Sequence, residues 1–291
     1  MGREWGFPVL TPMSDGLSEV KDFERDVKSV WAQRAARFRL NPSDRISGVL
    51  DAAGKTGMKN RYLDALLKRS VRRGLDPRSE DRLLEIGCGG GRLVEYLARS
   101  AERVVGTDLV DEYIFACRNA PGKRWNAHYL LRSEIDELRE LNPTKLYVVW
   151  VLMYVPTDEE IVRTLHDYLA RCGGVTRCVV IEQVSDRRRV ERVGGRWYCT
   201  YRTVEDYVRI FGLAGFGRVS VSRLGERRAG PCYRALRRLP SRIQRSLGVL
   251  GKLLYELDHA IVRSGRRSSD HSPGNGEVMD VMYVLRREPT T

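Results

Sequence analysis

Two apolar stretches in the middle of the chain end in residues that could bind a ligand. Residues 83–86 are apolar apart from Glu85 and lead into a run of four glycines and one cysteine at 87–91. A second stretch, 104–107, ends at Asp108. Glycines let the backbone take positive φ and approach a ligand closely, and an acid after the next strand can accept hydrogen bonds from two ribose hydroxyls. A carboxylate at Glu85 suits a ligand that carries an ammonium group better than one that carries a pyrophosphate.

Tyr154 and Glu182 are the candidate catalytic side chains. They lie near the carboxyl ends of two predicted strands, 146–152 and 177–184, where open α/β sheets bind ligands. Glu182 could act as a general base or a substrate ligand, and Tyr154 could contact a cofactor or a substrate. The structural alternatives are an ion pair with the nearby arginines for Glu182 and a cap on the edge of the core for Tyr154. The aromatic segment 196–202 adds candidates for the substrate side, namely Tyr198, Tyr201 and Arg202.

The elements that must position these residues alternate between strand and helix patterns. Predicted strands cover 82–87, 103–108, 127–131, 146–152, 177–184, 217–223 and 278–285, and predicted helices cover 91–99, 111–118, 133–140, 157–171 and 203–215. This alternation predicts parallel crossovers and a Rossmann-like, doubly wound α/β sheet. We expect a polar loop at 185–195, and helices at 17–38 and 59–73 before the first strand.

At this point the chain resembles a known family. The pattern Glu85-x-Gly87-x-Gly89-x-Gly91, followed by Asp108 twenty-three residues after Glu85, is similar to that of class I S-adenosylmethionine-dependent methyltransferases. The resemblance covers about 80–223 and 278–285 and implies their seven-stranded sheet, S-adenosylmethionine as cofactor and S-adenosylhomocysteine as product. The cofactor-binding residues that it implies are Glu85, Gly87, Cys88, Gly89, Gly91, Asp108, Leu109, Ser133, Glu134 and Trp150.

One segment departs from the family pattern. After the third strand the family often has an aspartate with an apolar neighbour, whereas this chain has Arg132, Ser133, Glu134 and Ile135. Either Ser133 or Glu134 could serve the adenine amine. The alternative for Glu134 is a solvated acid at the start of a helix.

The sequence divides into four predicted regions. These are an N-terminal arm with a helical cap (1–78), the cofactor-binding core (79–224), a basic helical insertion (225–276), and the last core strand with the C-terminus (277–291). The whole chain has a net charge of +13. Residues 225–272 alone carry eleven basic and four acidic side chains. The insertion could cover the substrate, lie on anionic lipid, follow a nucleic-acid backbone, or pack as a helical pair with a solvated arginine face.

The acceptor is predicted mainly from missing motifs. The sequence has neither the Asp/Asn-Pro-Pro-aromatic signature of amino methylation of nucleic acids nor paired cysteines for pyrimidine chemistry. This favours oxygen of a small-molecule, glycan or lipid-linked acceptor. An RNA or protein methyltransferase, and a protein that binds S-adenosylmethionine without transfer, stay open.

The cysteines and the N-terminus bear on the compartment. The six cysteines form no CxxC pair and lack zinc-ligand spacing, so we expect reduced thiols and no metal. There is no signal-peptide pattern, and no apolar run reaches the roughly 18 residues of a membrane span. We expect a cytoplasmic protein, peripheral to a membrane if the insertion binds lipid.

Overall fold

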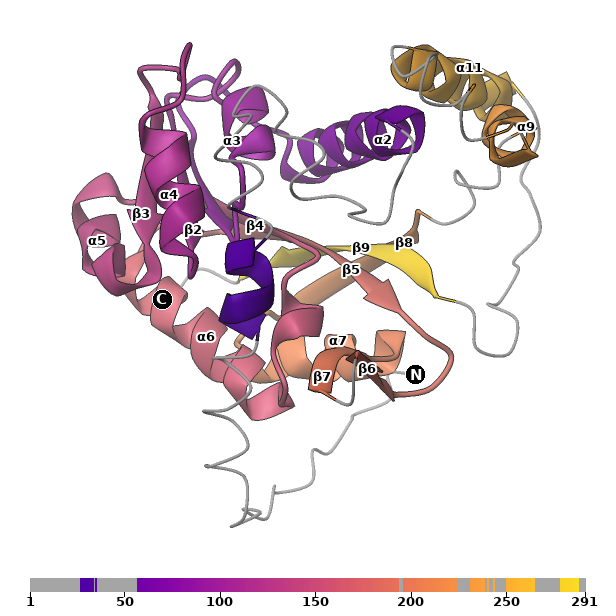
Figure 1. Cartoon of the computed structure of the whole chain (residues 1–291). Coiled ribbons are helices and arrows are strands. Elements are labelled where there is room, and N and C mark those ends of the chain that lie inside the picture. The colour runs from indigo at the N-terminus through magenta and orange to yellow at the C-terminus, as the bar shows by residue number, and fades with distance from the viewer. Residues whose placement is uncertain are drawn as a thin grey trace.

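A seven-stranded sheet with helices on both faces forms the centre of the molecule (Figure 1). The computed structural model describes residues 27–33, 35, 57–193, 196–224, 231–238, 240, 243, 250–264 and 278–287. The strand order is β3-β2-β1-β4-β5-β9-β8, and β9 alone among them is antiparallel to its neighbours. The strands are β1 (Arg82–Ile86), β2 (Arg103–Asp108), β3 (Ala127–Leu131), β4 (Lys145–Val149), β5 (Arg177–Val184), β8 (Arg218–Arg223) and β9 (Met279–Arg286). This is the Rossmann-like, mostly parallel sheet that the sequence predicts.

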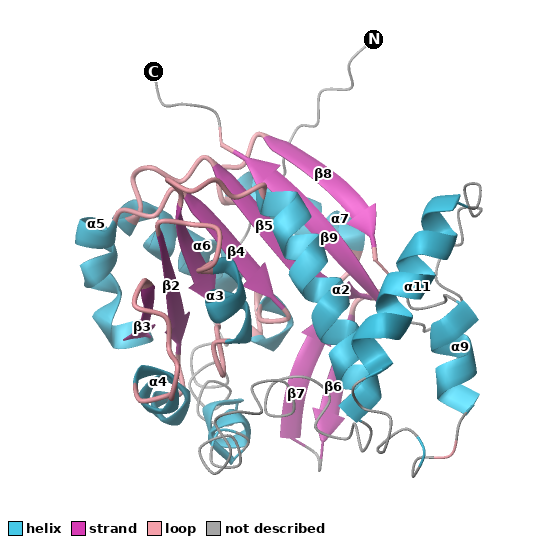
Figure 2. Cartoon of the chain, turned by 90° about the horizontal axis from the view of Figure 1, so that it is seen from above, coloured by secondary structure: helices cyan, strands magenta, loops and turns pink. Residues whose placement is uncertain are grey.

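The helices follow the strands as parallel crossovers require. They are α2 (Gly57–Leu75), α3 (Arg92–Leu97), α4 (Asp111–Arg118), α5 (Leu138–Leu141), α6 (Asp158–Arg171), α7 (Val204–Leu213), α9 (Pro231–Arg238) and α11 (Leu250–Ser264). Thr203 caps α7, because its hydroxyl accepts from the Asp206 amide while the Asp206 carboxylate accepts from the Thr203 amide. Figure 2 shows the strands of the main sheet side by side, with the hairpin β6–β7 beyond one end of it.

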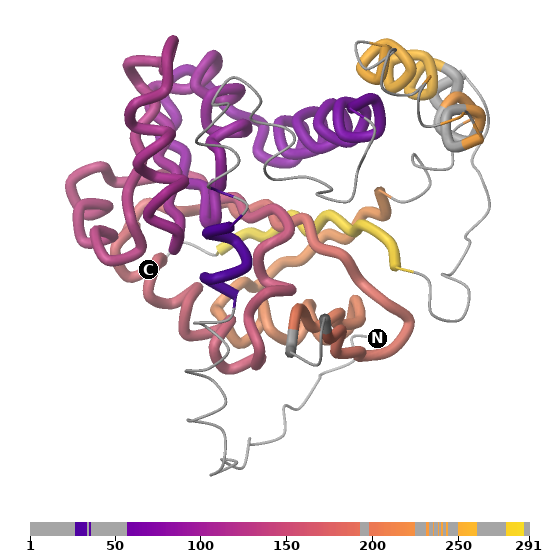
Figure 3. The backbone as a smooth tube through the Cα atoms, in the orientation of Figure 1, coloured from indigo at the N-terminus to yellow at the C-terminus, as the bar shows by residue number. Residues whose placement is uncertain are grey.

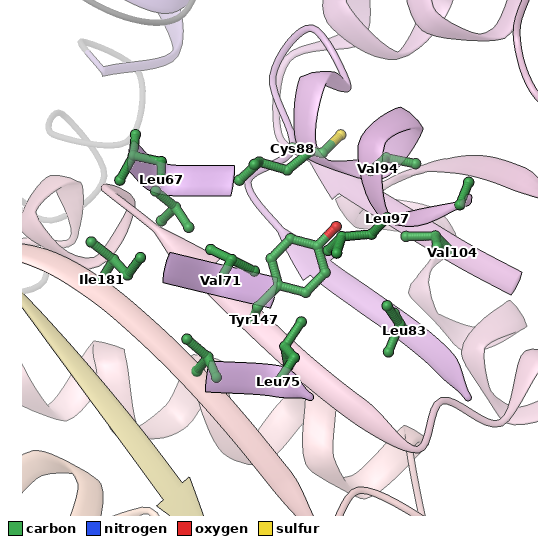
Figure 4. Packing of buried hydrophobic residues seen from close by; sticks show 14 of the residues in the cluster. Leu67, Val71, Leu75, Leu83, Cys88, Val94, Leu97, Val104, Tyr147 and Ile181 are labelled. Atoms are coloured by element: carbon green, nitrogen blue, oxygen red, sulfur yellow. The ribbon is translucent and has the colours of Figure 1, made fainter. Parts of the chain in front are cut away.

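Each face of the sheet has its own apolar core. One core joins β1, β2, β4 and β5 to α2, α3 and α4, and the other joins the opposite face to α6 and α7. In Figure 4, Val71 and Leu75 of α2 lie close to the ring of Tyr147 on β4, with Leu83 of β1 beside them. Burial on both faces explains why β4 and β5 are continuously apolar in sequence.

Besides shifts of one or a few residues at several ends, three predicted segments differ in part in their secondary structure. The expected loop at 185–195 contains a strand, β6 (Arg189–Val193), which pairs antiparallel with β7 (Arg196–Tyr201). The predicted strand 146–152 ends at Val149, and a 3₁₀ turn, η2 (Leu152–Tyr154), follows it. The expected helix at 133–140 is a 3₁₀ turn, η1 (Arg132–Glu137), that runs into the short α5. The sequence did not predict the strand at 189–193, because charged side chains stand on both of its faces.

Of the described helices of the insertion, α11 packs against α2 in the N-terminal part of the chain, and α9 packs against α11. The smooth trace in Figure 3 shows α11, near the end of the chain, beside α2, near its start. Tyr62 donates a hydrogen bond to the buried Asp258 (3.1 Å), and Arg69 forms an ion pair with Glu256 (2.8 Å). Two segments that are far apart in sequence therefore form one helical layer. Within the described residues, no helix is both long and apolar enough to cross a bilayer.

Candidate functional site

The glycine turn connects β1 to α3 at the carboxyl edge of the sheet. Gly87, Gly89 and Gly91 all have positive φ, which disfavours other residues. A Cβ atom on Gly87 would lie 2.3 Å from Val151, and one on Gly91 would lie 2.5 Å from the Tyr129 hydroxyl. The turn therefore needs glycine both for its backbone angles and for the space around it.

Asp108 ends β2 beside this turn. Its carboxylate accepts from the amide of Gly89 (2.8 Å) and from the amide of Val110 (3.0 Å). Burial raises the pKa of Asp108, while the backbone N–H groups that it accepts act in the opposite direction. The acid is half-buried, with the exposed Leu109 next to it. The predicted cofactor residues of β1 and β2 thus meet within one hydrogen-bonded unit.

Glu85 lies below the turn in the interior. Only 3% of its surface is exposed, and it accepts a hydrogen bond from the Tyr147 hydroxyl (3.1 Å). Burial raises its pKa to about 8, although the nearby Arg92 acts to lower it. Arg92 is itself buried and forms an ion pair with Asp64 on α2 (3.0 Å). In the free protein this carboxyl is therefore protonated near neutral pH.

The segment after β4 crosses the same edge in an unusual conformation. Trp150 has a φ of 56°, its amide donates to the carbonyl of Ile181 (2.8 Å), and its indole N–H donates to Asp280 on β9 (3.1 Å). The next three amides, those of Val151, Leu152 and Met153, all donate to the carboxylate of Glu182, at 2.9, 2.7 and 3.3 Å. Glu182 is fully buried, and burial raises its pKa to about 7.

The contacts of Glu182 differ from both roles that the sequence predicted for it. The carboxylate is covered by the backbone that it holds, so it does not face a substrate. An ion pair with the arginines of 187–189, the structural alternative, is also not its main contact. Glu182 instead positions the segment that carries Trp150 and Tyr154.

Arg202 holds the same segment from the other side and corrects a second prediction. Its guanidinium is fully buried and donates to the carbonyls of Leu152 (3.2 Å), Val155 (2.9 Å) and Pro156 (3.0 Å). Its Nε donates to Asp158 at the start of α6 (2.8 Å). A guanidinium with these four partners is not available to a substrate, so the predicted substrate contact is replaced by a structural one.

Asp158 links Arg202 to two more arginines. We call Glu182, Arg202 and Asp158, which together hold the segment after β4, the brace. It forms ion pairs with Arg188 and Arg209 in addition to Arg202. Burial acts to raise the pKa of Asp158, but the arginines outweigh it and hold the pKa below its ordinary value. The start of α6, the end of β7 and α7 are thereby tied together.

Aromatic rings gather above the braced segment. The ring of Tyr154 meets Trp31 edge-on at 5.2 Å and Tyr198 at 5.6 Å, and the hydroxyls of Tyr154 and Tyr198 are 3.4 Å apart. All three side chains are half-buried. Tyr201, by contrast, is buried with Met153 and Cys199, and Arg189 lies over its ring. Of the predicted substrate-side residues, Tyr198 is therefore the one placed beside Tyr154.

The helical segment 27–33 lies across this edge of the sheet. Lys28 forms an ion pair with Asp111 at the start of α4 (3.2 Å), while Trp31 contacts Tyr154 after β4. The segment thus spans the distance from the β2 side to the β4 side of the site. The rest of the predicted helix 17–38 lies outside the described residues, except for Ala35.

The segment after β3 supports the structural alternative for Glu134. Its carboxylate accepts from the amide of Leu131 (2.8 Å) and pairs with Arg118, and these contacts lower its pKa. Glu134 therefore caps its own turn, while Ser133 is exposed beside it. Cys88 is buried within the glycine turn, and its thiol has a raised pKa because of burial.

Comparison with known families identifies the core. Residues 83–173 match the family model described as "Methyltransferase domain". This part of the chain is similar to methyltransferase domains. The match spans β1 to the end of α6, and so contains the glycine turn, Asp108 and the braced segment of this methyltransferase domain.

Three solved structures are similar to this chain, and the first of them supports the fold described above. A Leishmania major SAM-dependent methyltransferase of the DUF858 family has a TM-score of 0.50 at 17% identity, with 88% of this chain and 83% of that chain covered. DhpI, solved with SAH, has a TM-score of 0.47 at 16% identity, with 96% and 100% covered. Geranyl diphosphate C-methyltransferase from Streptomyces coelicolor A3(2), solved with Mg²⁺, geranyl-S-thiolodiphosphate and SAH, has a TM-score of 0.48 at 17% identity, with 76% and 75% covered. No curated protein matches the sequence.

Sequence reasoning did not foresee the brace of the methyltransferase domain. Asp158 was read only as part of a helix, and Arg202 only as a substrate contact. A useful signal was the apolar run 178–181 that leads directly into Glu182, because a carboxyl group buried with that strand must find hydrogen-bond donors nearby.

Proposed function

We propose that this methyltransferase transfers the methyl group of S-adenosylmethionine to an oxygen atom of a small-molecule, glycan or lipid-linked acceptor. The observation that carries the proposal is the pair of half-buried hydroxyls of Tyr154 and Tyr198, 3.4 Å apart, above the segment after β4. Hydroxyls can position an acceptor oxygen, and the rings of Tyr154 and Trp31 offer a surface for a sugar ring or an apolar chain.

The residues present fit the cofactor. The turn at 87–91 has the backbone angles and lacks the Cβ atoms that would obstruct a close ligand. Asp108 ends β2 where a carboxylate can accept from ribose hydroxyls, and Glu85 offers a buried carboxyl that an ammonium group beside it would favour in the ionised form. When bound, the sulfonium of S-adenosylmethionine supplies an electrophilic methyl group.

The chain's own part in the reaction is alignment and exclusion of water. Glu182 and Arg202 fix the segment that carries Tyr154, and in-line positioning of this kind can supply much of the rate. Neither of them faces the acceptor to remove a proton. An acceptor oxygen that is already acidic, such as a phenol or a carboxyl group, needs no strong base and suits this site best.

Calorimetry with S-adenosylmethionine and S-adenosylhomocysteine tests the cofactor site. Asp108→Asn should weaken both affinities by about tenfold or more, because it removes charge-assisted hydrogen bonds. Asp136→Asn, at an exposed acid that pairs with Arg171, is the matched control. Unchanged affinity in Asp108→Asn, with the fold intact by circular dichroism, would contradict the proposed cofactor site.

An acceptor panel tests the second half of the proposal. Phenols, carboxylic acids, glycans and polyprenyl-linked sugars are incubated with the cofactor, and mass spectrometry follows the gain of one methyl group. Tyr198→Phe should raise KM more than it lowers kcat, while Tyr96→Phe on α3 serves as a control away from the Tyr154 pair. Methylation of an amine or a carbon, with no oxygen methylated, would refute the choice of oxygen.

The Arg-rich surface supports a second candidate, an RNA or protein methyltransferase. The net charge of +13 would favour a polyanionic substrate. Binding of RNA should then weaken steeply as salt rises, whereas binding of a small neutral acceptor should show little salt dependence.

A further inference from the structure

Basic residues stand side by side across the end of the sheet that lies opposite the glycine turn. Lys145 begins β4, Arg177 begins β5, Arg286 ends β9 and Arg218 begins β8. The strand register places each of these residues directly opposite the next. Because cross-strand partners point to the same face of a sheet, the side chains form one line, about 5 Å apart from strand to strand. We call these residues the basic row.

The basic row is unfavourable for the fold alone. Like charges directly opposite each other in a sheet repel and destabilise it. At the β4 end, Asp81 forms an ion pair with the lysine of the row (N···O 2.6 Å), and Asp76 lies farther from the guanidinium of Arg177 (N···O 3.8 Å). Arg218 and Arg286 are exposed, and no ion pair joins them to an acid within the described residues. Their charges are therefore available to a ligand outside the chain.

An open groove between α2 and α11 continues this positive surface. Arg177 donates to the carbonyl of Leu75, the last residue of α2 (3.3 Å), so the basic row and α2 share one face of the sheet. Arg72 and Arg73 are exposed in the last turn of α2. The lining of the groove is mainly basic and consists of Arg69, Arg72, Arg73, Asp76, Pro77 and His259. The dipole of α2 favours cations in its last turn, but it does not account for arginines on neighbouring strands.

We propose that the basic row and the adjoining groove bind the phosphodiester backbone of a nucleic acid, whatever its base sequence. The backbone presents one negative charge per nucleotide, and positive groups about 5 Å apart can contact neighbouring phosphates. Guanidinium groups bind phosphate bidentately. A nucleic acid bound here is not the methyl acceptor, because the basic row lies at the amino ends of the parallel strands, whereas the glycine turn follows the carboxyl end of β1 (Figure 2).

The composition of this surface favours a nucleic acid over other anionic partners. Apart from Pro77, the basic row and the groove lining consist of charged side chains and one histidine. A membrane-docking surface needs apolar side chains that enter the bilayer interface, and a protein–protein interface has an apolar core. Contacts to a nucleic-acid backbone need neither, since they are mainly electrostatic.

Fluorescence anisotropy of the full chain tests the proposal, with a labelled single-stranded RNA and a labelled DNA duplex, each about 20 nucleotides long. We expect binding that weakens steeply as salt rises. Arg218→Gln/Arg286→Gln should lower the affinity for the RNA about fivefold per arginine at about 0.1 M salt, and should reduce the log–log salt slope by about 0.7 for each. Because the substitution removes charges that repel each other, thermal unfolding should show a Tm no lower than that of the wild type.

The matched control removes the same charge from the opposite edge of the sheet. Arg187→Gln/Arg192→Gln, at two exposed residues in and beside β6, should leave the affinity unchanged. The proposal would be overturned if neither nucleic acid bound, if the basic-row variant bound as tightly as the wild type, or if both variants lost affinity equally. Vesicles with phosphatidylglycerol are the last arm: binding to them that the basic-row variant loses, with neither nucleic acid bound, would overturn the proposal in favour of a lipid surface. None of these results depends on methyl transfer, so they leave the proposed function to its own tests.

Discussion

The buried carboxyl of Glu85 should make the free protein less stable as the pH rises. In the unfolded chain this group ionises near its ordinary pKa of 4.5, whereas burial raises the folded pKa to about 8. Below about pH 4.5 the group is neutral in both states and has no effect on stability. Between these two values the unfolded state releases its proton while the folded state keeps it, so stability falls as pH rises. Above about pH 8 the full cost remains, about 3 to 5 kcal/mol.

Glu85→Gln isolates this contribution. Glutamine is neutral at every pH and still accepts the hydrogen bond from Tyr147. The variant should match the wild type near pH 5 and exceed it by about 3 to 5 kcal/mol above pH 8, with the difference growing by about 1.4 kcal/mol per pH unit. Urea unfolding followed by tryptophan fluorescence at several pH values measures both proteins. Glu140→Gln, at an exposed glutamate on α5, should leave the pH dependence unchanged.

The same substitution should act in the opposite direction on cofactor binding. If Glu85 receives the ammonium group of S-adenosylmethionine, Glu85→Gln should bind it about tenfold or more weakly while unfolding less readily. A variant that is less stable than the wild type above pH 8, or one whose stability curve runs parallel to that of the wild type, would refute the reasoning about burial. Unchanged cofactor affinity would refute only the assignment of the ammonium group.

Three further substitutions test the turn and the brace. Gly91→Ala should destabilise the fold by about 1 to 3 kcal/mol in urea, because φ is 69° and the new Cβ would lie 2.5 Å from the Tyr129 hydroxyl; no loss of stability would contradict it. Arg202→Lys should cost about 2 to 4 kcal/mol in the same assay, since an ammonium group cannot reach all four partners of the guanidinium, and a neutral result would show the brace to be dispensable. Glu182→Gln should lower kcat with cofactor affinity little changed, because one amide oxygen cannot accept from all three backbone N–H groups and the segment that carries Tyr154 is held less rigidly; an unchanged kcat would contradict this role.

The strands and the cofactor turn could be predicted from sequence because their signals are local. A buried parallel strand must be apolar on both faces, and the turn at 87–91 must be glycine where φ is positive, so residue type alone indicates both. The strand at 189–193 could not be found in this way. Both of its faces carry charged side chains, and its pairing with β7 is visible only when the two segments are placed side by side.

The roles of charged residues depend on contacts that the sequence does not contain. Glu182 and Arg202 have the types expected of a base and a substrate ligand, and they flank the correct edge of the sheet. Their roles are decided by the segment after β4, which leaves the strand at Trp150. Three amides of this segment donate to Glu182, and three of its carbonyls accept from Arg202. That departure depends on a positive φ at a tryptophan, which no residue preference would indicate.

The brace has a consequence for how the acceptor site works. Because Glu182 and Arg202 both bind backbone groups, the acceptor site that we propose uses, among the described residues, the aromatic ones that the braced segment carries or contacts, Tyr154, Tyr198 and Trp31. Rings and hydroxyls discriminate by shape and by hydrogen bonding rather than by charge. Catalysis at such a site should therefore depend strongly on how rigidly Tyr154 is held, and substitutions in the buried brace should reduce turnover even though no atom of the brace touches a substrate.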